Sequence, residues 1–153
     1  MAELSLRSAK RNDCKLLWRW ANDPEVRRNA YDSEAIPWKD HIEWFERKMS
    51  SSSSAIYIAE VGSEPIGQIR FDIDGSVAVV DASVAKAKRG KGYGTTLIRR
   101  GTQRFLERSK VERVDAYVKT ENVASRNAFK KAGYFLKDKV EKKGEMSCRF
   151  SFS

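Results

Sequence analysis

Two spacings of apolar residues divide the chain into expected strands and expected helices. Alternating apolar and polar residues predict strands, whereas apolar residues three or four positions apart predict helices. Strands are expected at residues 3–8, 55–61, 66–72, 77–85, 111–119, 134–140 and 146–152. Helices are expected at residues 13–22, 33–49, 95–107 and 122–132, with a further helical turn from Glu25. The order of these elements predicts one α+β domain that spans residues 1–153.

Turn and capping residues mark where several of these elements end. Pro37 is expected near the first turn of its helix, where the missing N–H costs little. Asp74 and Gly75 favour a hairpin turn between two strands. Asn122 is placed to cap a helix, and Gly133 is placed to end it. These signals separate the elements without marking a boundary between domains.

The composition is that of a folded protein and narrows the class. The 153 residues are 41% hydrophobic and 10% aromatic, which excludes general disorder. No apolar run approaches the ~20 residues of a membrane helix, and the N-terminus lacks a signal-peptide hydrophobic region. Cys14 and Cys148 are the only cysteines and His41 is the only histidine, so neither a disulfide scaffold nor a metal site is expected. The protein is expected in a reducing cytoplasm, with no membrane partner.

The chain is strongly basic, with 30 Lys and Arg against 21 Asp and Glu and a net charge of +9. Such a charge attracts anions, including phosphorylated small molecules. Residues 86–114 hold ten of the basic side chains and only two acidic ones. Arg100, Arg104 and Arg108 fit either a solvated helix face or part of a phosphate-binding region. No aromatic RNA-binding motif accompanies them, so nucleic acid is not an expected partner.

A glycine-rich loop lies inside this basic stretch, between an expected strand and an expected helix. Residues 89–94 read Arg-Gly-Lys-Gly-Tyr-Gly. Glycines let the backbone turn sharply, and N–H groups at the start of a helix can bind phosphate oxygens. The spacing fits neither the GxxxxGK(S/T) loop of nucleotide hydrolases nor the GxGxxG fingerprint of dinucleotide-binding folds. The loop therefore predicts a phosphate site of another kind.

This loop and a second motif resemble those of the GNAT superfamily of acyl-CoA-dependent N-acetyltransferases. The pyrophosphate loop of that family reads R/Q-x-x-G-x-G/A, which is filled here by Arg89, Gly92 and Gly94. The second motif, N-x-x-S/A-x-x-x-F/Y-x-x-x-G-F/Y, is filled by Asn122, Ser125, Phe129, Gly133 and Tyr134. The resemblance covers nearly the whole chain. It implies a mixed, mostly antiparallel twisted sheet flanked by helices, with acetyl-CoA as co-substrate.

The resemblance also implies where coenzyme A binds. In this family the strand before the loop separates from its neighbour, and the pantetheine arm lies in the gap. Asn122 would hydrogen-bond the pantetheine, with helix capping as the alternative role of Asn122 and Ser125. The implied coenzyme-binding residues are Ser83, Val84, Arg89, Gly90, Lys91, Gly92, Tyr93, Gly94, Thr95, Asn122, Ser125, Phe129 and Lys130.

The reaction implied is attack of a neutral amine on a thioester, which needs a proton acceptor and donors for the oxyanion. Many members of the family carry a tyrosine as the acid for the thiolate, where this chain has Phe129. Ser125, a water molecule or no acid at all would take its place. The candidates for the base are Glu121, Asp81, Asp72 and His41. Glu121 and Ser125 are the expected catalytic residues, since Glu121 ends the strand beside the gap.

The N-terminal segment forms the acceptor side of this fold. Its pattern W-x-N-D-P-x-V-R at residues 20–27, followed by H-x-x-W-F, resembles the sugar-nucleotide N-acetyltransferases, including those of pseudaminic-acid-type biosynthesis. GQIRFD at residues 67–72 fits that group too, whereas Ala21 stands where related sugar enzymes often have arginine. The resemblance implies an anionic small molecule, a UDP-amino-sugar, as acceptor. The implied substrate-binding residues are Arg27, Tyr31, His41 and Asp72.

Two other functions are compatible with the sequence. Asn22-Asp23-Pro24 also occurs in acetyltransferases that act on ribosomal-protein N-termini, and a peptide, polyamine or aminoglycoside acceptor would need a cleft suited to cations. A CoA-binding or RNA-associated module without catalysis is the third possibility, because Phe129 cannot donate a proton. Exposed strand edges make either a monomer or a homodimer compatible with the sequence.

Overall fold

The computed structural model describes residues 3–153 and contains the strands and helices in the expected order. The strands are β1 (Leu4–Ser8), β2 (Ser54–Val61), β3 (Glu64–Asp74), β4 (Val77–Val84), β5 (Arg113–Lys119), β6 (Phe135–Lys142) and β7 (Glu145–Phe152). The helices are α1 (Cys14–Ala21), α2 (Pro24–Asn29), α3 (Trp38–Ser50), α4 (Tyr93–Arg108) and α5 (Val123–Lys131), with short 3-10 turns η1 (Arg11–Asp13) and η2 (Lys86–Lys88). None of the helices within residues 3–153 has both the length and the apolar character needed to cross a membrane.

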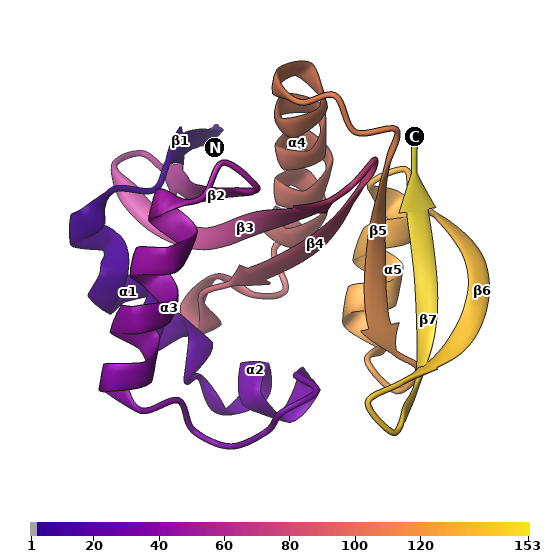
Figure 1. The fold of residues 1–153 in the computed structure, drawn as a ribbon, viewed down its shortest axis with the longest axis horizontal. Coiled ribbons are helices and arrows are strands. Elements are labelled where there is room, and N and C mark those ends of the chain that lie inside the picture. The colour runs from indigo at the N-terminus through magenta and orange to yellow at the C-terminus, as the bar shows by residue number, and fades with distance from the viewer. Residues whose placement is uncertain (1–2) are drawn as a thin grey trace.

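The seven strands form one sheet in the order β1-β2-β3-β4-β5-β7-β6. Neighbouring strands are antiparallel except β4 and β5, which run parallel. The pairing of β4 with β5 is limited to residues 77–79 of β4 and 113–115 of β5. Beyond these residues the two strands diverge, and the sheet opens into two halves with α2 at the opening (Figure 1). The α+β class and the mostly antiparallel sheet expected from the sequence are confirmed.

Helices cover both faces of the half of the sheet that contains β1 to β4. Successive side chains of a strand point to opposite faces, so β2 contributes to two separate cores. Tyr57 belongs to the core beneath α4, together with Phe105. Ile58 belongs to the core beneath α1 and α3, together with Leu17 and Phe45. This half of the sheet, which is packed on both faces, forms one side of the opening between β4 and β5.

Two arginines of the basic helix α4 hold the edge strand β1. Arg100 donates a hydrogen bond to the carbonyl oxygen of Leu4, and Arg104 Nη1 donates to that of Leu6 at 2.8 Å. An edge strand exposes unpaired backbone groups, and these side chains satisfy two of them. Arg100 and Arg104 therefore stabilise the fold and do not take part in a phosphate-binding region.

The helix expected at residues 33–49 starts later than the hydrophobic pattern indicated. Pro37, expected near its first turn, is its N-cap residue. The preceding loop is fixed through Ile36, whose N–H donates to Asn22 Oδ1 at 2.7 Å and whose C=O accepts from the Trp18 indole at 2.8 Å. These tertiary hydrogen bonds compete with helix formation, and they cannot be seen in a local pattern.

Candidate active site

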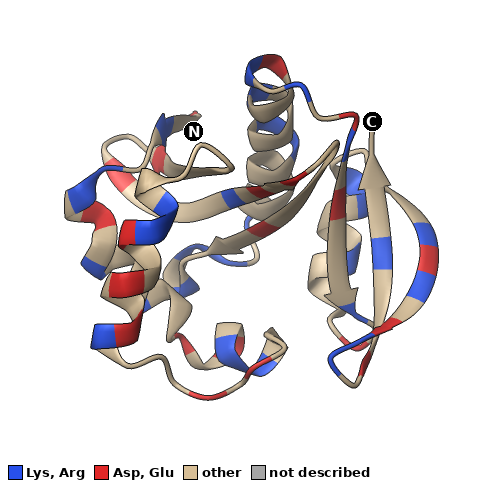
Figure 2. Cartoon of the chain, viewed as in Figure 1, with Lys and Arg blue, Asp and Glu red and all other residues tan. Residues whose placement is uncertain are grey.

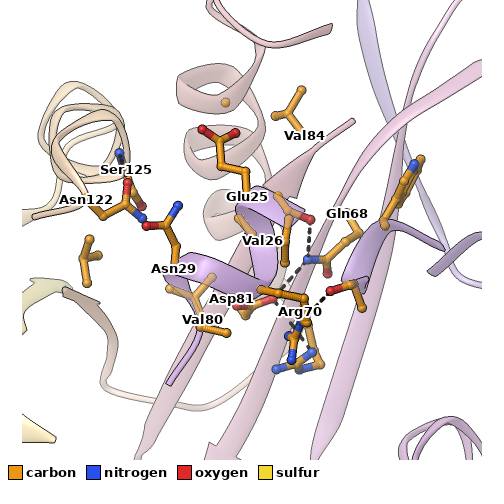
Figure 3. A pocket seen from close by; sticks show the side chains of 18 of the residues that line it. Glu25, Val26, Asn29, Gln68, Arg70, Val80, Asp81, Val84, Asn122 and Ser125 are labelled. Carbon is orange, nitrogen blue, oxygen red and sulfur yellow. Dashed lines mark hydrogen bonds and ion pairs between the residues drawn. The ribbon is translucent and has the colours of Figure 1, made fainter. Parts of the chain in front are cut away.

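A cavity of about 740 Å³ lies where β4 and β5 separate. Its wall contains residues of all five helices and of strands β2 to β5. Figure 3 shows Glu25, Val26 and Asn29 of α2 between β4 and α5, with Asn29 and Asn122 pointing toward one another. Segments far apart in the sequence therefore meet at the opening of the sheet.

The glycine loop borders one end of this cavity. Gly90 and Gly92 have left-handed backbone angles, with φ of 76° and 84°, and Gly92 is the N-cap residue of α4. Glycine adopts such angles without steric cost, so the loop can turn directly into the helix. Arg89 and Gly94 lie on the cavity wall, whereas the residues between them and Thr95 do not.

The Arg89 side chain connects this loop to α2. Its Nη2 lies 3.0 Å from Asp23 Oδ1, its Nη1 lies 2.8 Å from Glu25 Oε2, and its Nε donates to the Val84 carbonyl at 3.0 Å. Asp23 Oδ1 also accepts from the N–H groups of Glu25 and Val26, which caps α2. Burial alone would raise the pKa of Asp23, but the guanidinium and the two amides hold that pKa below its usual value. Asp23 thus caps α2 and also forms an ion pair with the glycine loop.

A polar network covers the face of β3 and β4 that looks into the cavity. Gln68 Nε2 donates to Asp81 Oδ2 at 3.0 Å and to Ser83 Oγ at 3.1 Å (Figure 3). Arg70 Nη1 lies 3.9 Å from the same Asp81 oxygen. The Asp81 side chain remains 57% exposed, so its carboxylate is positioned by neighbours and still open to a ligand.

Asp72, expected to bind substrate and considered as a base, does not line the cavity. Its carboxylate accepts from Lys48 Nζ and Ser54 Oγ, each at 2.7 Å, and from Arg70 Nε at 2.9 Å. Burial would raise the pKa of Asp72, but these donors hold it below its usual value. The position of Asp72 on β3 directs its carboxylate toward α3 and β2, where it joins structural elements.

The second motif contributes the α5 side of the cavity. Asn122 Oδ1 accepts from the Ser125 N–H at 3.3 Å, so Asn122 caps α5 while also lining the cavity. Ser125 and the buried Phe129 line the cavity from the same helix. Glu121 and Lys130 are exposed and lie outside the cavity wall. The structure therefore brings three of these five predicted residues to the site.

Arg27 and Tyr31 line the cavity on its acceptor side. Arg27 Nε donates to the Ala21 carbonyl at 2.7 Å, and its Nη1 donates to the Asp32 carbonyl at 2.9 Å. The Tyr31 hydroxyl is 2.6 Å from Ser147 Oγ on β7. Arg27 thus stabilises the segment around α2 by hydrogen bonds to its backbone. Tyr31 connects the end of that segment to β7, in the half of the sheet that contains β5 to β7.

His41 also lines the cavity, as part of an aromatic wall. It is 3% exposed, and its ring lies within 6.2 Å of the ring centres of Trp38, Trp44 and Phe45. Its Nε2 is 2.8 Å from the Cys14 carbonyl oxygen. Burial lowers the pKa of His41. The imidazole is therefore already engaged at one nitrogen and packed as a core side chain.

Comparison with known families decides the class of this site. Residues 3–134 match the acetyltransferase (GNAT) domain. The chain belongs to this family. It is therefore an acetyl-CoA-dependent N-acetyltransferase, as the two sequence motifs implied. No protein with a curated description matches the sequence.

Solved structures share the GNAT fold at low sequence identity. A spermidine N-acetyltransferase from Vibrio cholerae, in complex with CoA and spermine, aligns with a TM-score of 0.87 at 17% identity, covering 97% of this chain and 94% of that one. The aminoglycoside acetyltransferase AAC(6')-Ib, with ribostamycin and coenzyme A, aligns at 0.85 and 21%, covering 97% and 92%. RimL, a ribosomal L7/L12 α-N-protein acetyltransferase with CoA, aligns at 0.83 and 12%, covering 97% and 93%. At these identities the likeness shows the fold, and the acceptors differ among the three.

The cavity wall contains residues to which the sequence analysis assigned no role. These are Glu25, Asn29, Gln68, Arg70, Tyr117 and Lys119. A signal existed for Gln68 and Arg70, because these polar residues alternate with the apolar Ile69 and Phe71 along β3 and share a face with Asp81. No comparable signal marks Glu25 or Asn29, which reach the site only because α2 lies at the opening of the sheet.

Proposed function

We propose that this GNAT protein acetylates the primary amine of a small molecule with an anionic body, foremost a nucleotide-linked deoxyamino sugar. The charge of the cavity wall carries this proposal. Five wall residues are cationic and three are acidic, namely Arg27, Arg47, Arg70, Arg89 and Lys119 against Glu25, Asp40 and Asp81. Glu25 and Arg89 are paired with one another, which leaves four cationic wall residues against two acidic ones. A polycation would meet mostly like charge in this cavity, whereas an anionic body would meet mostly opposite charge.

In this proposal, coenzyme A lies in the gap between β4 and β5. Within residues 3–153, the pairing of β4 with β5 ends at Val79, so the backbone of β4 beyond it can pair with the pantetheine beside Ser83 and Val84. The glycine loop, residues 89–94, leads into the N-terminus of α4, where phosphate oxygens are favoured. These features support the pyrophosphate at the loop and the thioester near the middle of the gap.

Asp81 is the wall residue best suited to take the proton from the acceptor ammonium. Gln68 and Arg70 position its carboxylate, and it remains exposed to the cavity. Once Asp81 has accepted the proton, the amine lone pair attacks the thioester carbonyl and the C–N bond forms. The C–S bond then breaks as the tetrahedral intermediate collapses, and the surplus proton on the nitrogen leaves to solvent, while the departing thiolate takes up a proton. Glu121, outside the cavity wall, is less suited to this role.

The thiolate needs no strong acid to leave. Phe129 occupies the position of the usual tyrosine and offers no proton. Ser125 lines the cavity and is the candidate donor, with solvent as the alternative. A thiolate is a fair leaving group, so loss of the Ser125 hydroxyl is expected to slow turnover less than loss of the base.

Thiol release from acetyl-CoA tests the acceptor. A UDP-linked amino-deoxyhexose, spermidine, an aminoglycoside and a ribosomal N-terminal peptide are supplied in parallel at equal concentration. Release that is fastest with the nucleotide sugar supports the proposal. Release confined to spermidine, the aminoglycoside or the peptide would discard the anionic acceptor while leaving the family intact.

A further inference from the structure

Two lysines and two tyrosines gather on the β5 side of the cavity. The Lys142 ammonium lies 4.0 Å from the ring centre of Tyr117 and 5.3 Å from that of Tyr31. The Lys119 ammonium lies 5.8 Å from the ring centre of Tyr31. We refer to Tyr31, Tyr117, Lys119 and Lys142 as the lysine–tyrosine cluster. The first three line the cavity, and Lys142 does not.

The strand register places Tyr117 and Lys119 of this cluster on the same face of the sheet as Asp81. Val79 of β4 pairs with Asp115 of β5 in the parallel ladder. Two residues further along each strand, the same face carries Asp81 on β4 and Tyr117 on β5, because side chains alternate with a period of two. The next same-face position on β5 is Lys119. The two edges of the gap therefore present a carboxylate on one side and a cation beside tyrosines on the other.

The cluster carries positive charge that its surroundings compensate weakly. Lys119 is 7% exposed, with its Nζ 3.3 Å from the Arg28 carbonyl oxygen and 4.0 Å from Glu145 Oε1. Among residues 3–153, no carboxylate lies within ion-pair distance of Lys142. Burial lowers the pKa of Lys142, and Lys143 adds to this. Along β6 and the β6–β7 turn, basic residues alternate with acidic ones (Figure 2). An incompletely paired cation in a partly buried site favours an anionic ligand.

We propose that the lysine–tyrosine cluster binds a phosphate group of the acceptor and so directs the acceptor amine toward Asp81. Lys119 contacts the phosphate from the cavity wall. Lys142 lies next to both tyrosine rings and adds positive charge behind them. The tyrosines also offer flat apolar surface to the sugar or base that carries the phosphate. This inference rests on the proposed function, since it requires an acceptor with an anionic body.

Binding of UDP tests the cluster without any turnover. Calorimetry is performed on the full chain with coenzyme A in saturating amount, so that the glycine loop is already occupied. We expect Lys119→Met to weaken UDP binding by about 10-fold and Lys142→Met by about 3-fold, as loss of a charge-assisted contact requires. Lys139→Met, which removes an exposed lysine of β6, is the matched control and should leave UDP binding unchanged.

Uridine and Lys119→Arg separate phosphate recognition from a structural role. Uridine lacks the phosphates, so its weaker binding should not change in Lys119→Met. Lys119→Arg keeps the charge and should restore UDP affinity to within about 3-fold of the original. Equal losses of UDP and uridine binding in Lys119→Met would overturn the proposal. So would failure of the unmodified protein to bind UDP, or unchanged UDP binding in both lysine variants.

The same variants distinguish this inference from the proposed function. If UDP binds through Lys119 but no amino sugar is acetylated, the cluster is a phosphate site and the acceptor class is wrong. If an amino sugar is acetylated and its KM is the same in Lys119→Met, the acceptor class stands and the cluster is overturned. When both are correct, Lys119→Met raises the KM for the sugar and leaves the KM for acetyl-CoA unchanged.

Discussion

The two ends of the cavity are built in different ways. At the glycine-loop end, the groups proposed to bind phosphate are backbone N–H groups of adjacent residues, and their arrangement depends on the left-handed angles of Gly90 and Gly92. At the acceptor end, the polar groups are side chains from α2, β3, β4 and β5. Several of them are positioned by contacts with other side chains, as Gln68 positions Asp81 and Arg89 positions Glu25. A backbone site is encoded in adjacent residues, so a short motif reveals it. A side-chain site exists only after the elements have assembled.

This difference predicts how each end responds to change. One residue at the loop end controls several N–H groups together, so a single substitution there should remove binding. At the acceptor end, several side chains have different roles. A single substitution there should therefore lower either turnover or stability, and only in part. The following variants test that contrast, from the largest expected effect to the smallest.

Gly92→Asp is expected to weaken acetyl-CoA binding by more than about 100-fold. The left-handed angle of Gly92 is strained for any side chain, and a carboxylate would repel the pyrophosphate. A Cβ at Gly92 would meet no atom within 4 Å, so the variant should still fold. Calorimetric titration with acetyl-CoA measures the loss, and circular dichroism checks the fold.

Gly75→Asp is the control for backbone strain. Gly75 also has a left-handed angle, with φ of 65°, and a Cβ there also meets no atom within 4 Å. It lies in the turn between β3 and β4, far along the chain from the loop. Its acetyl-CoA affinity should equal that of the original protein. Comparable losses in the two variants would show that strain, and not the loop, controls binding.

Asp81→Asn is expected to lower kcat by about 100-fold, the range for removing a general base. The amide keeps the size of the side chain and its place beside Gln68, but it cannot accept the ammonium proton. The KM for acetyl-CoA should stay within about 2-fold. Steady-state kinetics at saturating acetyl-CoA measures both constants.

Glu121→Gln supplies the contrast for this prediction. Glu121 is exposed and lies outside the cavity wall, so its variant should keep nearly full turnover. If Glu121→Gln lost activity while Asp81→Asn kept it, the base would be the residue that the sequence indicated first. The geometry that favours Asp81 would then have no catalytic meaning.

Asp23→Ala is expected to lower the free energy of unfolding by about 1–3 kcal/mol, because it removes a helix cap and a charged partner of Arg89. The lowered pKa of Asp23 sets the pH dependence of its contribution. That contribution is complete above the ordinary value of 3.8 and is lost as the pH falls through the lower folded-state pKa. Urea unfolding at neutral and acid pH measures both effects.

Asp23→Asn separates the contribution of the helix cap from that of the ion pair, and Glu43→Ala is the control for loss of a surface carboxylate. Asparagine retains a capping oxygen, so Asp23→Asn should lose only the part due to the ion pair. Glu43→Ala removes an exposed carboxylate of α3 and should change stability by less than about 0.5 kcal/mol. A loss in Asp23→Asn equal to that in Asp23→Ala would assign the whole effect to the charge.

Two strand aspartates show what the sequence could and could not predict. The alternating pattern placed Asp72 and Asp81 on neighbouring strands, and the loop motif placed the coenzyme nearby. Only the tertiary contacts separate their roles, since Lys48 on α3 engages Asp72 and leaves Asp81 open. Glu121 was favoured for its place beside Asn122, but a position in the chain does not fix the direction of a side chain. Local signals thus predicted the elements and the loop, and packing between distant segments decided the rest.

The smallest expected effect concerns His41 and the aromatic wall. Burial lowers the pKa of His41 below its ordinary value of 6.5, so the unfolded chain takes up the proton first as the pH falls. Stability should therefore decrease below pH 6.5, by no more than about 1.4 kcal/mol for each pH unit, until the folded-state pKa is reached. His41 is the only histidine, so its proton NMR signals report this pKa directly. His41→Gln should be less stable at neutral pH. Its stability should not show the His41-dependent decrease between about pH 7 and pH 5. A His41 that titrates near 6.5 would mean that its ring is open to solvent, and the acceptor end would then be a looser structure than the packing of Trp44 and Phe45 implies.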